Sequence, residues 1–506
     1  MGGVVVTGAM VDFADVQGLV RFGYRRMTDA RYELLRIRNA EAARSWLRSA
    51  PITTAVTLSP PPKAALQVAF TASGLKALGV AESVIAAFSH EFRAGMAERS
   101  RARQLGDVGD NAPSGWDWGH GASEPHLVVM FFAEPGHLDA LIGRCCQDAW
   151  GEAFERVRRL DTSNLDGIEP FGFADGASQP QIDWEERRET PCVQWDYSNL
   201  VALGEFLLGY RNEYGKITDR PLLKDDASTA QLLPALDAAT LKDLGRNGTY
   251  LVMRQLDQDV RGFWQFLGRR AGGSFVEAET IATAMVGRTR AGEPLMSIQD
   301  HAIPGIGPDP EQIRQNQFTF DRDPSGARCP FGAHIRRANP RSTDYPGRPT
   351  GIAKLMTMLG FGPSGFRDDL ISSVRFHRIL RRGREYGSEL APEEAMKSGP
   401  DGEAARGLHF ICLNANIGRQ FEFVQNAWIS NTKFAAMSGE SDPLLGNRAP
   451  LVGCPRTDEF SMPVEGGMRR RITGLPPFVR LRGGAYFFLP SIRALRYFAG
   501  VTGPTS

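Results

Sequence analysis

The feature that most constrains the fold is a strand-then-helix pattern that occurs near the start of the chain and again after its midpoint. Residues 31–49 (RYELLRIRNAEAARSWLRS) begin as an alternating, β-prone run and continue with alanine, tryptophan and leucine at helical spacing. Residues 249–268 (TYLVMRQLDQDVRGFWQFLG) repeat this order, with an apolar run, a polar break and an amphipathic segment. The recurrence indicates that the chain restarts near residue 245.

Further strand–helix units strengthen this repeat. They lie at residues 66–80 and 127–145 in the first half and at 408–428 in the second. Such a split βαβ arrangement favours an antiparallel sheet with helices packed on it. We therefore predict an α+β fold of two ferredoxin-like domains, each an antiparallel β-sheet flanked by helices, of the dimeric α+β barrel type.

The predicted domains are residues 1–230 and residues 231–506. Length supports the division, because 506 residues exceed the size at which a single hydrophobic core usually stops growing. Residues 215–245 are polar and rich in turn-forming residues, which is typical of a connector or a long surface loop.

Charge balance and cysteine content exclude several classes of function. With 59 basic and 58 acidic residues, the net charge of +1 gives no field to attract nucleic acid or an anionic membrane. The six cysteines form no CxxC pair, which argues against a zinc ribbon and favours a reducing compartment. There is no twin-arginine or signal-peptide pattern at the start, and no apolar window of about 18 residues anywhere. We therefore expect a cytoplasmic, soluble protein with a small or neutral partner.

The first candidate site residue is Asp175, which stands in the segment GFADG at 172–176. Flanking glycines allow the backbone to approach a flat ligand closely. Glycine and aspartate also gather in ordinary turns, so a turn aspartate is the alternative interpretation.

The second candidate is His334, in the segment CPFGAHIRRANPR at 329–341. Proline and glycine before it and Asn-Pro after it predict a short helical turn or a loop. The chain has eight histidines and shows no HExxH or His/Cys spacing, so a multi-ligand metal site is not indicated. A haem differs, because the porphyrin supplies four nitrogens and one histidine is then a sufficient protein ligand.

The third candidate is Arg381, in the segment HRILRRGREYG at 377–387. A run of arginines is usually a solvated edge of a strand or helix. Here Ile379 and Leu380 come directly before Arg381, and Gly383 follows it. Alternation would turn part of the segment inward, so Arg381 is the best candidate for a buried arginine.

Taken together, the three segments resemble the signature blocks of the dye-decolorizing peroxidases, and other stretches extend the similarity over nearly the full length. These stretches are VQGLVRFGY at 16–24, FRAGMAERSR at 92–101, GEFLLGYRNEYG at 204–215, GRQFEFVQNAW at 418–428 and GGAYFFLPSIRAL at 483–495. The chain resembles one of the longer bacterial-type members of that family. The resemblance implies two ferredoxin-like domains that enclose one haem b per chain.

By position, the resemblance implies that His334 is the axial ligand of the haem iron, Asp175 the distal carboxylate and Arg381 the distal arginine. The first domain would then carry the GxxDG loop, and the second would carry the histidine and the arginine. Gly176, which closes that loop, would also contact the cofactor.

Other residues would surround the haem if the resemblance holds. Arg341 is expected to pair with a haem propionate or to lie at the surface. Leu408 and Phe410 lie two apart on a predicted strand, so they share a face that lines the distal pocket or belongs to the core. Asp442 is a candidate for the carboxylate behind His334.

The implied function is that of a haem peroxidase, which uses hydrogen peroxide to oxidise dyes and other aromatic reductants in one-electron steps. The alternative is a haem-binding or haem-handling protein with little peroxidase turnover. We expect an acidic optimum for dye oxidation, because the acid–base group is an aspartate. Nucleic acid and membrane partners are not expected, and a homo-oligomer stays open. The segment 342–374 is expected to cover a haem edge or to form an oligomer contact.

Overall fold

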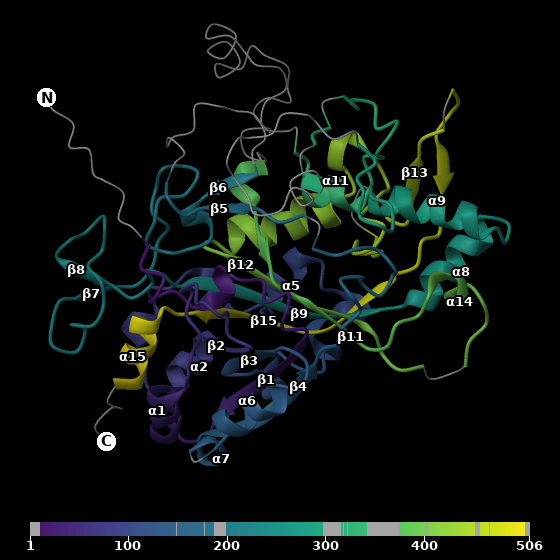
Figure 1. The fold of residues 1–506 in the computed structure, drawn as a ribbon. Coiled ribbons are helices and arrows are strands. Elements are labelled where there is room, and N and C mark those ends of the chain that lie inside the picture. Colours follow the sequence, from purple (N-terminus) through teal and green to yellow (C-terminus); the bar gives the residue numbers. More distant parts are fainter. Residues whose placement is uncertain are drawn as a thin grey trace, which may run out of the picture.

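The structure is a computed structural model in which one nine-stranded sheet runs through the whole molecule (Figure 1). It describes residues 11–147, 149–176, 178–186, 199–296, 315–316, 318–320, 322–341, 374–400, 403–450, 456–464 and 466–500. The strand order is β10-β12-β9-β15-β2-β3-β1-β4, with β11 beside β12. Of the segment 342–374, for which we expect a covering or contact role, residues 342–373 lie outside the described residues.

The first half of the sheet has the ferredoxin-like order, with the fourth strand beside the first and the third beside the second. Its elements are β1 (Asp29–Ile37), α1 (Ala40–Ser49), β2 (Ala64–Phe70), α2 (Ala72–Ala77), β3 (Leu127–Ala133), α6 (Leu138–Cys145) and β4 (Phe154–Asp161). All three pairings are antiparallel. The side chain of Asn39 begins α1 by accepting the N–H groups of Glu41 and Ala42. The predicted strand–helix units of this half are confirmed.

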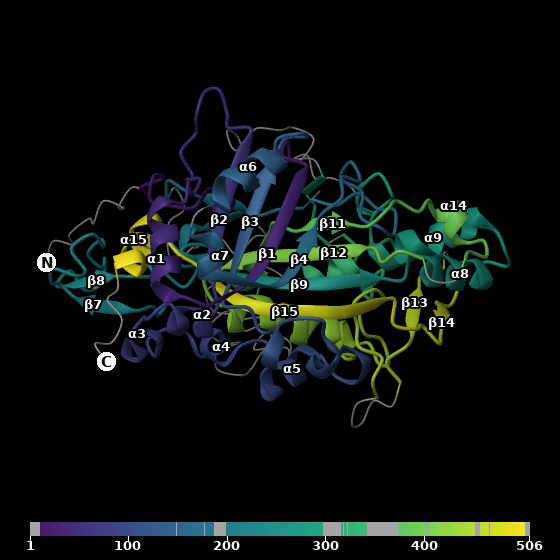
Figure 2. The same cartoon turned by 90° about the horizontal axis from the view of Figure 1, so that it is seen from below.

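The second half repeats that order with β15 as its fourth strand, β9 as its first and β12 as its third. Its elements are β9 (Thr249–Gln258), α8 (Val260–Arg270), α9 (Phe275–Val286), β10 (Leu380–Arg381), β11 (Arg384–Tyr386), β12 (Gly407–Asn414) and β15 (Val479–Leu489). Strand β2 meets β15 through the pair Phe70 and Phe488, so the two halves form one sheet. In Figure 2 the strands β1 and β3 cross the direction of β9, β12 and β15 steeply.

Apolar side chains cover both faces of the sheet. One cluster joins α1 and α6 with strand residues such as Phe131, Val252 and Phe488. The other lies on the opposite face and includes Tyr32, Met130, Leu251 and Phe487. Helix α15 (Ile492–Gly500) packs against α1, so the end of the second half contacts the first (Figure 1).

The remaining elements are short. They are η1 (Gly18–Val20), α3 (Glu82–Ile85), α4 (His90–Ala94), α5 (Arg99–Leu105), η2 (Gly109–Asn111), η3 (Pro113–Gly115), η4 (Gly121–Ser123), α7 (Trp150–Ala153), β5 (Gln181–Asp183), β6 (Leu200–Ala202), η5 (Leu203–Glu205), β7 (Leu222–Lys224), β8 (Leu241–Asp243), α11 (His334–Ala338), η6 (Val374–His377), α14 (Pro392–Ala395), η9 (Phe434–Ala436), β13 (Phe460–Met462) and β14 (Arg470–Ile472). Among the helices that the structure describes, none is long and apolar enough to cross a membrane.

Two details differ from the sequence-based expectation. The helical part of residues 408–428 is wound as two π-helical segments, η7 (Gly418–Glu422) and η8 (Val424–Ser430). The connector at 215–245 contains a small antiparallel pair, β7 with β8. Strands β4 and β9 fall on either side of residue 230, and the domain limits 1–230 and 231–506 stay a prediction.

Candidate active site

Asp175 and Arg381, which lie far apart in the sequence, meet in an ion pair. Arg381 Nη1 donates to Asp175 Oδ1 at 2.9 Å. The same guanidinium reaches the carbonyl oxygen of Ser178 at 3.3 Å through Nη2. Both atoms of this pair come from the segments that the sequence singled out, and the contact joins the first half of the chain to the second.

Asp175 is presented by a loop that is folded back on itself. Its backbone N–H donates to the carbonyl of Gly167 at 2.8 Å, and Gly172 and Gly176 adopt φ values of +96° and +71°. These values favour glycine. At Gly172, an added Cβ would also lie 2.9 Å from a Pro392 side-chain atom. The glycines of GFADG are therefore required by this turn.

Arg381 is fixed by the sheet and by one side chain. It ends the short strand β10, where it lies opposite Cys412 of β12. Its backbone N–H donates to Gln179 Oε1 at 3.0 Å. Gln179 therefore binds the backbone of Arg381 and Ser178 binds its guanidinium. Because both residues come shortly after Asp175, this loop positions the whole arginine.

The charge of Asp175 is stabilised inside the protein. Burial acts to raise the pKa of this carboxyl group, but the Arg381 guanidinium and the N–H of Gly176 outweigh it, and the pKa lies below the ordinary value of 3.8. Asp175 is therefore an ionised proton acceptor at neutral and mildly acidic pH.

His334 begins the short helix α11 and contacts Asp442. The imidazole Nδ1 lies 2.9 Å from Asp442 Oδ2, and the other carboxylate oxygen accepts the N–H groups of Leu444 and Leu445, each at 2.9 Å. The Asp442 side chain is fully buried. The expected pairing of Asp442 with His334 is confirmed.

This contact determines which histidine nitrogen is available. Burial acts to lower the pKa of His334, but the Asp442 carboxylate outweighs it and the pKa is raised. Burial acts in the opposite sense on Asp442, and His334 brings the pKa of that group below its ordinary value. An ionised carboxylate accepts the Nδ1 proton, so the Nε2 lone pair is left to bind a metal.

The histidine and the ion pair share one environment. The Arg381 guanidinium acts to lower the pKa of His334, and His334 acts to lower the pKa of Asp175. The side chains of His334, Asp175 and Arg381 are 27, 30 and 34 % exposed, in contrast to the fully buried Asp442. One available imidazole nitrogen, with an acid–base pair nearby, is the donor set that a haem requires from its protein.

The other predicted site residues have mixed outcomes. Arg341 is 2 % exposed, so the surface alternative is wrong. Its Nη1 donates to the carbonyls of Asn316 and Phe318 at 2.7 and 3.2 Å, and its Nη2 donates to Ser178 Oγ at 3.1 Å. A buried arginine is therefore linked directly to the Asp175 loop.

Leu408 and Phe410 are partly buried on β12. Because Arg381 lies opposite Cys412 and side chains alternate, both residues share the sheet face of Arg381. Phe410 also packs near Phe421, with ring centroids 6.1 Å apart, as a core residue would. Their role beside a haem stays a prediction, as does that of Gly176.

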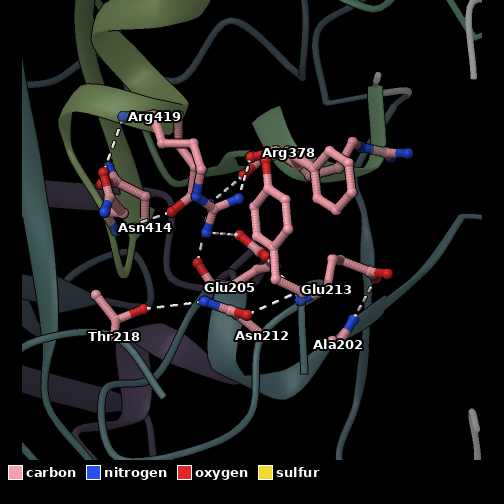
Figure 3. Close-up of polar contacts among 12 residues, drawn as sticks. Ala202, Glu205, Asn212, Glu213, Thr218, Arg378, Asn414 and Arg419 are labelled. Carbon is pink, nitrogen blue, oxygen red and sulfur yellow. Dashed lines mark hydrogen bonds and ion pairs between the residues drawn. The ribbon is translucent and has the colours of Figure 1, made fainter. Parts of the chain in front are cut away.

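A buried network that sequence analysis did not predict anchors the segment before Arg381. Arg419 Nη2 pairs with Glu205 Oε2 at 2.6 Å, and Figure 3 shows these two groups pointing toward each other. Arg419 also donates to the Phe376 carbonyl, and Gln420 Nε2 donates to the Arg378 carbonyl at 2.5 Å. These residues come from η5 and η7, so no local pattern reveals them.

Known proteins resemble the chain over nearly its whole length, although no family model matches it. It is 27 % identical over 513 residues to the dye-decolorizing peroxidase of Exidia glandulosa, covering 95 % of this chain and 86 % of that protein. An ancestral D-type dye-decolorizing peroxidase has a similar structure, with a TM-score of 0.70 and 25 % identity over 96 % of this chain and 99 % of that one. A dye-decolorizing peroxidase in complex with 2,6-dimethoxyphenol shares the fold, with a TM-score of 0.68 and 24 % identity over 97 % of this chain and 100 % of that one. The relatives and solved structures that the chain resembles are thus dye-decolorizing peroxidases, and the chain shares their fold.

Proposed function

We propose that the chain is a haem-dependent peroxidase that uses hydrogen peroxide to oxidise dyes and other aromatic reductants in one-electron steps. The observation that carries the proposal is the Asp175–Arg381 ion pair, at 2.9 Å, in the same electrostatic environment as His334. A carrier of haem needs an axial ligand but has no use for this distal pair. The complex of a related enzyme with 2,6-dimethoxyphenol supports an aromatic reductant.

The proposed cofactor is one haem b per chain, and His334 Nε2 would bind its iron. When bound, the haem supplies the redox centre that takes two oxidising equivalents from peroxide and returns them singly to reductants. Arg341 is the proposed partner of a propionate, and its buried position beside Ser178 is compatible with an inward-facing role. Leu408, Phe410 and Gly176 complete the proposed contact set.

Asp175 is the proposed acid–base group of the peroxide step. Heterolysis requires that a proton leave the inner oxygen of peroxide and reach the outer oxygen. An ionised carboxylate can accept the first proton, and in its neutral form it can deliver that proton to the departing oxygen. The Gly176 N–H and Arg381 keep Asp175 ionised beforehand, so the group starts the cycle as a base.

Arg381 is proposed to hold peroxide and to stabilise the negative charge that develops on the departing oxygen. Its guanidinium is fixed in advance by Asp175 and by the Ser178 carbonyl. Donors that are preorganised in this way typically lower a reaction barrier by about 3 kcal/mol.

Asp442 is proposed to make His334 a stronger donor to iron by accepting its Nδ1 proton. Replacing Asp442 with asparagine should raise the haem reduction potential and lower peroxidase turnover by about 10- to 100-fold. Potentiometric titration and steady-state assays of the holoenzyme would measure both effects. The exposed Asp110→Asn variant is the control, and an unchanged potential in Asp442→Asn would contradict this role.

The pH dependence of the peroxide step should follow the ionisation of Asp175. Because the pKa of this group is held below 3.8, the base form persists at mildly acidic pH and is lost only as the pH falls through that low pKa. We expect a rate constant for peroxide that is flat from neutral pH to about pH 4 and declines below it. Stopped-flow decay of the Soret band would measure it, and a decline that begins near pH 6 would argue against Asp175.

The direct test of function is a visible spectrum of haem-reconstituted protein before and after one equivalent of hydrogen peroxide, followed by an anthraquinone dye. A Soret band that changes with peroxide and returns as the dye bleaches would support the peroxidase. A band that ignores peroxide would favour the alternative, a haem-binding or haem-handling protein with little turnover. A colourless protein would remove the haem proposal.

We also propose a cytoplasmic location. Four cysteines of the described residues are free, Cys145, Cys146, Cys329 and Cys412, as expected in a reducing compartment. A homo-oligomer is an open part of the same proposal, and size-exclusion chromatography with light scattering would test it.

A further inference from the structure

Glu169 stands six positions before Asp175, and its carboxylate turns back onto the loop that follows. Oε2 accepts the N–H of Phe171 at 3.1 Å, and Oε1 accepts the N–H of Phe173 at 3.2 Å. The Glu169 backbone is also paired with this loop, because its N–H donates to the Phe173 carbonyl and its carbonyl accepts the N–H of Gly172, both at 2.8 Å. One residue thus closes the turn of GFADG through four contacts.

The same carboxylate is tied to the sheet. Gln258, the last residue of β9, donates through Nε2 to Glu169 Oε2 at 2.8 Å. Gln258 is 6 % exposed, and within the described part of the chain its Oε1 has no hydrogen-bond partner. The Gln258 side chain therefore makes its one hydrogen bond here to Glu169, which joins the loop to a central strand.

Two aromatic side chains of the loop, Phe171 and Phe173, are buried, and Phe171 packs on α8. Phe171 and Phe173 are 2 and 3 % exposed, and the Phe171 ring lies 4.7 Å from that of Phe263 between centroids. Trp264 of α8 donates through Nε1 to the Phe171 carbonyl at 3.0 Å. The loop is thus held by packing on α8 and by the Glu169 carboxylate on β9, and Asp175 follows it directly.

Glu169 also acts on the site through its charge. The pKa of its carboxyl is raised to about 7, chiefly by burial, with a further contribution from Asp175. It also acts to raise the pKa of His334. A negative charge at this position therefore affects both the distal carboxylate and the proposed axial histidine.

We propose that Glu169 is a positioning residue of the peroxide site, which fixes the Asp175 loop against β9 through Gln258 and sets the geometry in which Asp175 meets Arg381. This inference rests on the proposed function of Asp175 and Arg381. The Glu169 carboxylate would act in two ways, through its hydrogen bond to Gln258 and through the effect of its charge on Asp175.

Two variants of the holoenzyme separate these effects. Glu169→Gln removes the charge and one of the N–H acceptors, so the rate constant for peroxide should fall about tenfold, as expected from a small misplacement of catalytic groups. Because the pKa of Glu169 is about 7, its carboxyl group is already neutral at the pH of the acid limb, so the limb should stay in place and the effect of the lost charge should appear only above about pH 7. Gln258→Met removes the tether and keeps the charge, so the rate constant should fall about tenfold to the same extent above and below pH 7.

The reaction with the dye is the internal control, because neither variant should change it. At saturating peroxide, kcat/KM for the dye should be unchanged in both variants, and haem content and Tm should match those of the Glu155→Gln control on the exposed edge strand β4. If both variants keep the wild-type rate constant while Asp175→Asn lowers the rate, the inference is wrong and the proposed function stands. If Asp175→Asn itself has no effect, the proposed function fails first.

Discussion

Replacing His334 with alanine is expected to abolish the Soret band of the reconstituted protein and to lower dye oxidation on the order of 10³-fold or more. Among the described residues of the candidate site, His334 has a ring nitrogen free to bind iron, because its Nδ1–H donates to Asp442 Oδ2 at 2.9 Å and leaves Nε2 available. Loss of that nitrogen would leave the proposed haem iron without its protein ligand. Haem titration by absorbance and a peroxide-dependent dye assay would measure the two losses.

Controls distinguish loss of the ligand from loss of the fold. His90→Ala changes a histidine that is exposed on α4 and should bind haem normally. Adding imidazole to His334→Ala should restore part of the Soret band, because the small ring can occupy the space of the lost side chain. A His334→Ala protein with the full wild-type spectrum would show that another group binds the iron.

The architecture could be predicted because its determinants are local. Each strand–helix unit has its own periodicity, so residues 31–49 and 249–268 could be read as β1 with α1 and β9 with α8. The junction between the halves depends on Phe70 and Phe488, which are distant in the sequence and carry no pairing signal. The periodicity of the sequence therefore could not predict that the two halves form a single continuous sheet.

The site shows the same division between local and distant information. Asp175 and His334 stand in short frames rich in glycine and proline, and these frames single them out. Asp442 lies 108 positions from His334, and only a family resemblance suggests the pairing. Glu169 belongs to a segment that is typical of a loop, and only the folded turn brings its carboxylate to the N–H groups of Phe171 and Phe173.

The surroundings of Arg381 show why a run of arginines is a weak signal. Arg378 and Arg381 stand three apart, yet the structure uses them differently. Arg378 donates to the side chain of Asn199 at 2.7 Å, whereas Arg381 pairs with Asp175 at 2.9 Å. The difference follows from the short strand β10, which places Arg381 opposite Cys412 on the face shared with Phe410. Charge alone could not choose between them.

Removing Asp175 and Arg381 together should cost less than the product of the two single losses, because each group prepares the other for the peroxide step. Asp175→Asn removes the proton acceptor and should lower the rate constant for peroxide by about 10² to 10⁴-fold. Arg381→Leu should lower it by about 10²-fold, the effect expected from losing one preorganised donor. The groups are in direct contact at 2.9 Å, so a coupling energy of about 1 to 3 kcal/mol is expected between them.

The coupling has a direction that pH can reveal. Without the guanidinium, burial is no longer outweighed and the pKa of Asp175 should rise, so Arg381→Leu should move the acid limb of the peroxide rate constant to higher pH. Asp175→Asn should have no such limb. Stopped-flow measurements on the wild type, both single variants and the double variant, each with matched haem content, would close the cycle. The pair would not act as one unit if the losses were strictly multiplicative and the acid limb of Arg381→Leu stayed in place. The ion pair would then stabilise the structure without taking part in the peroxide step.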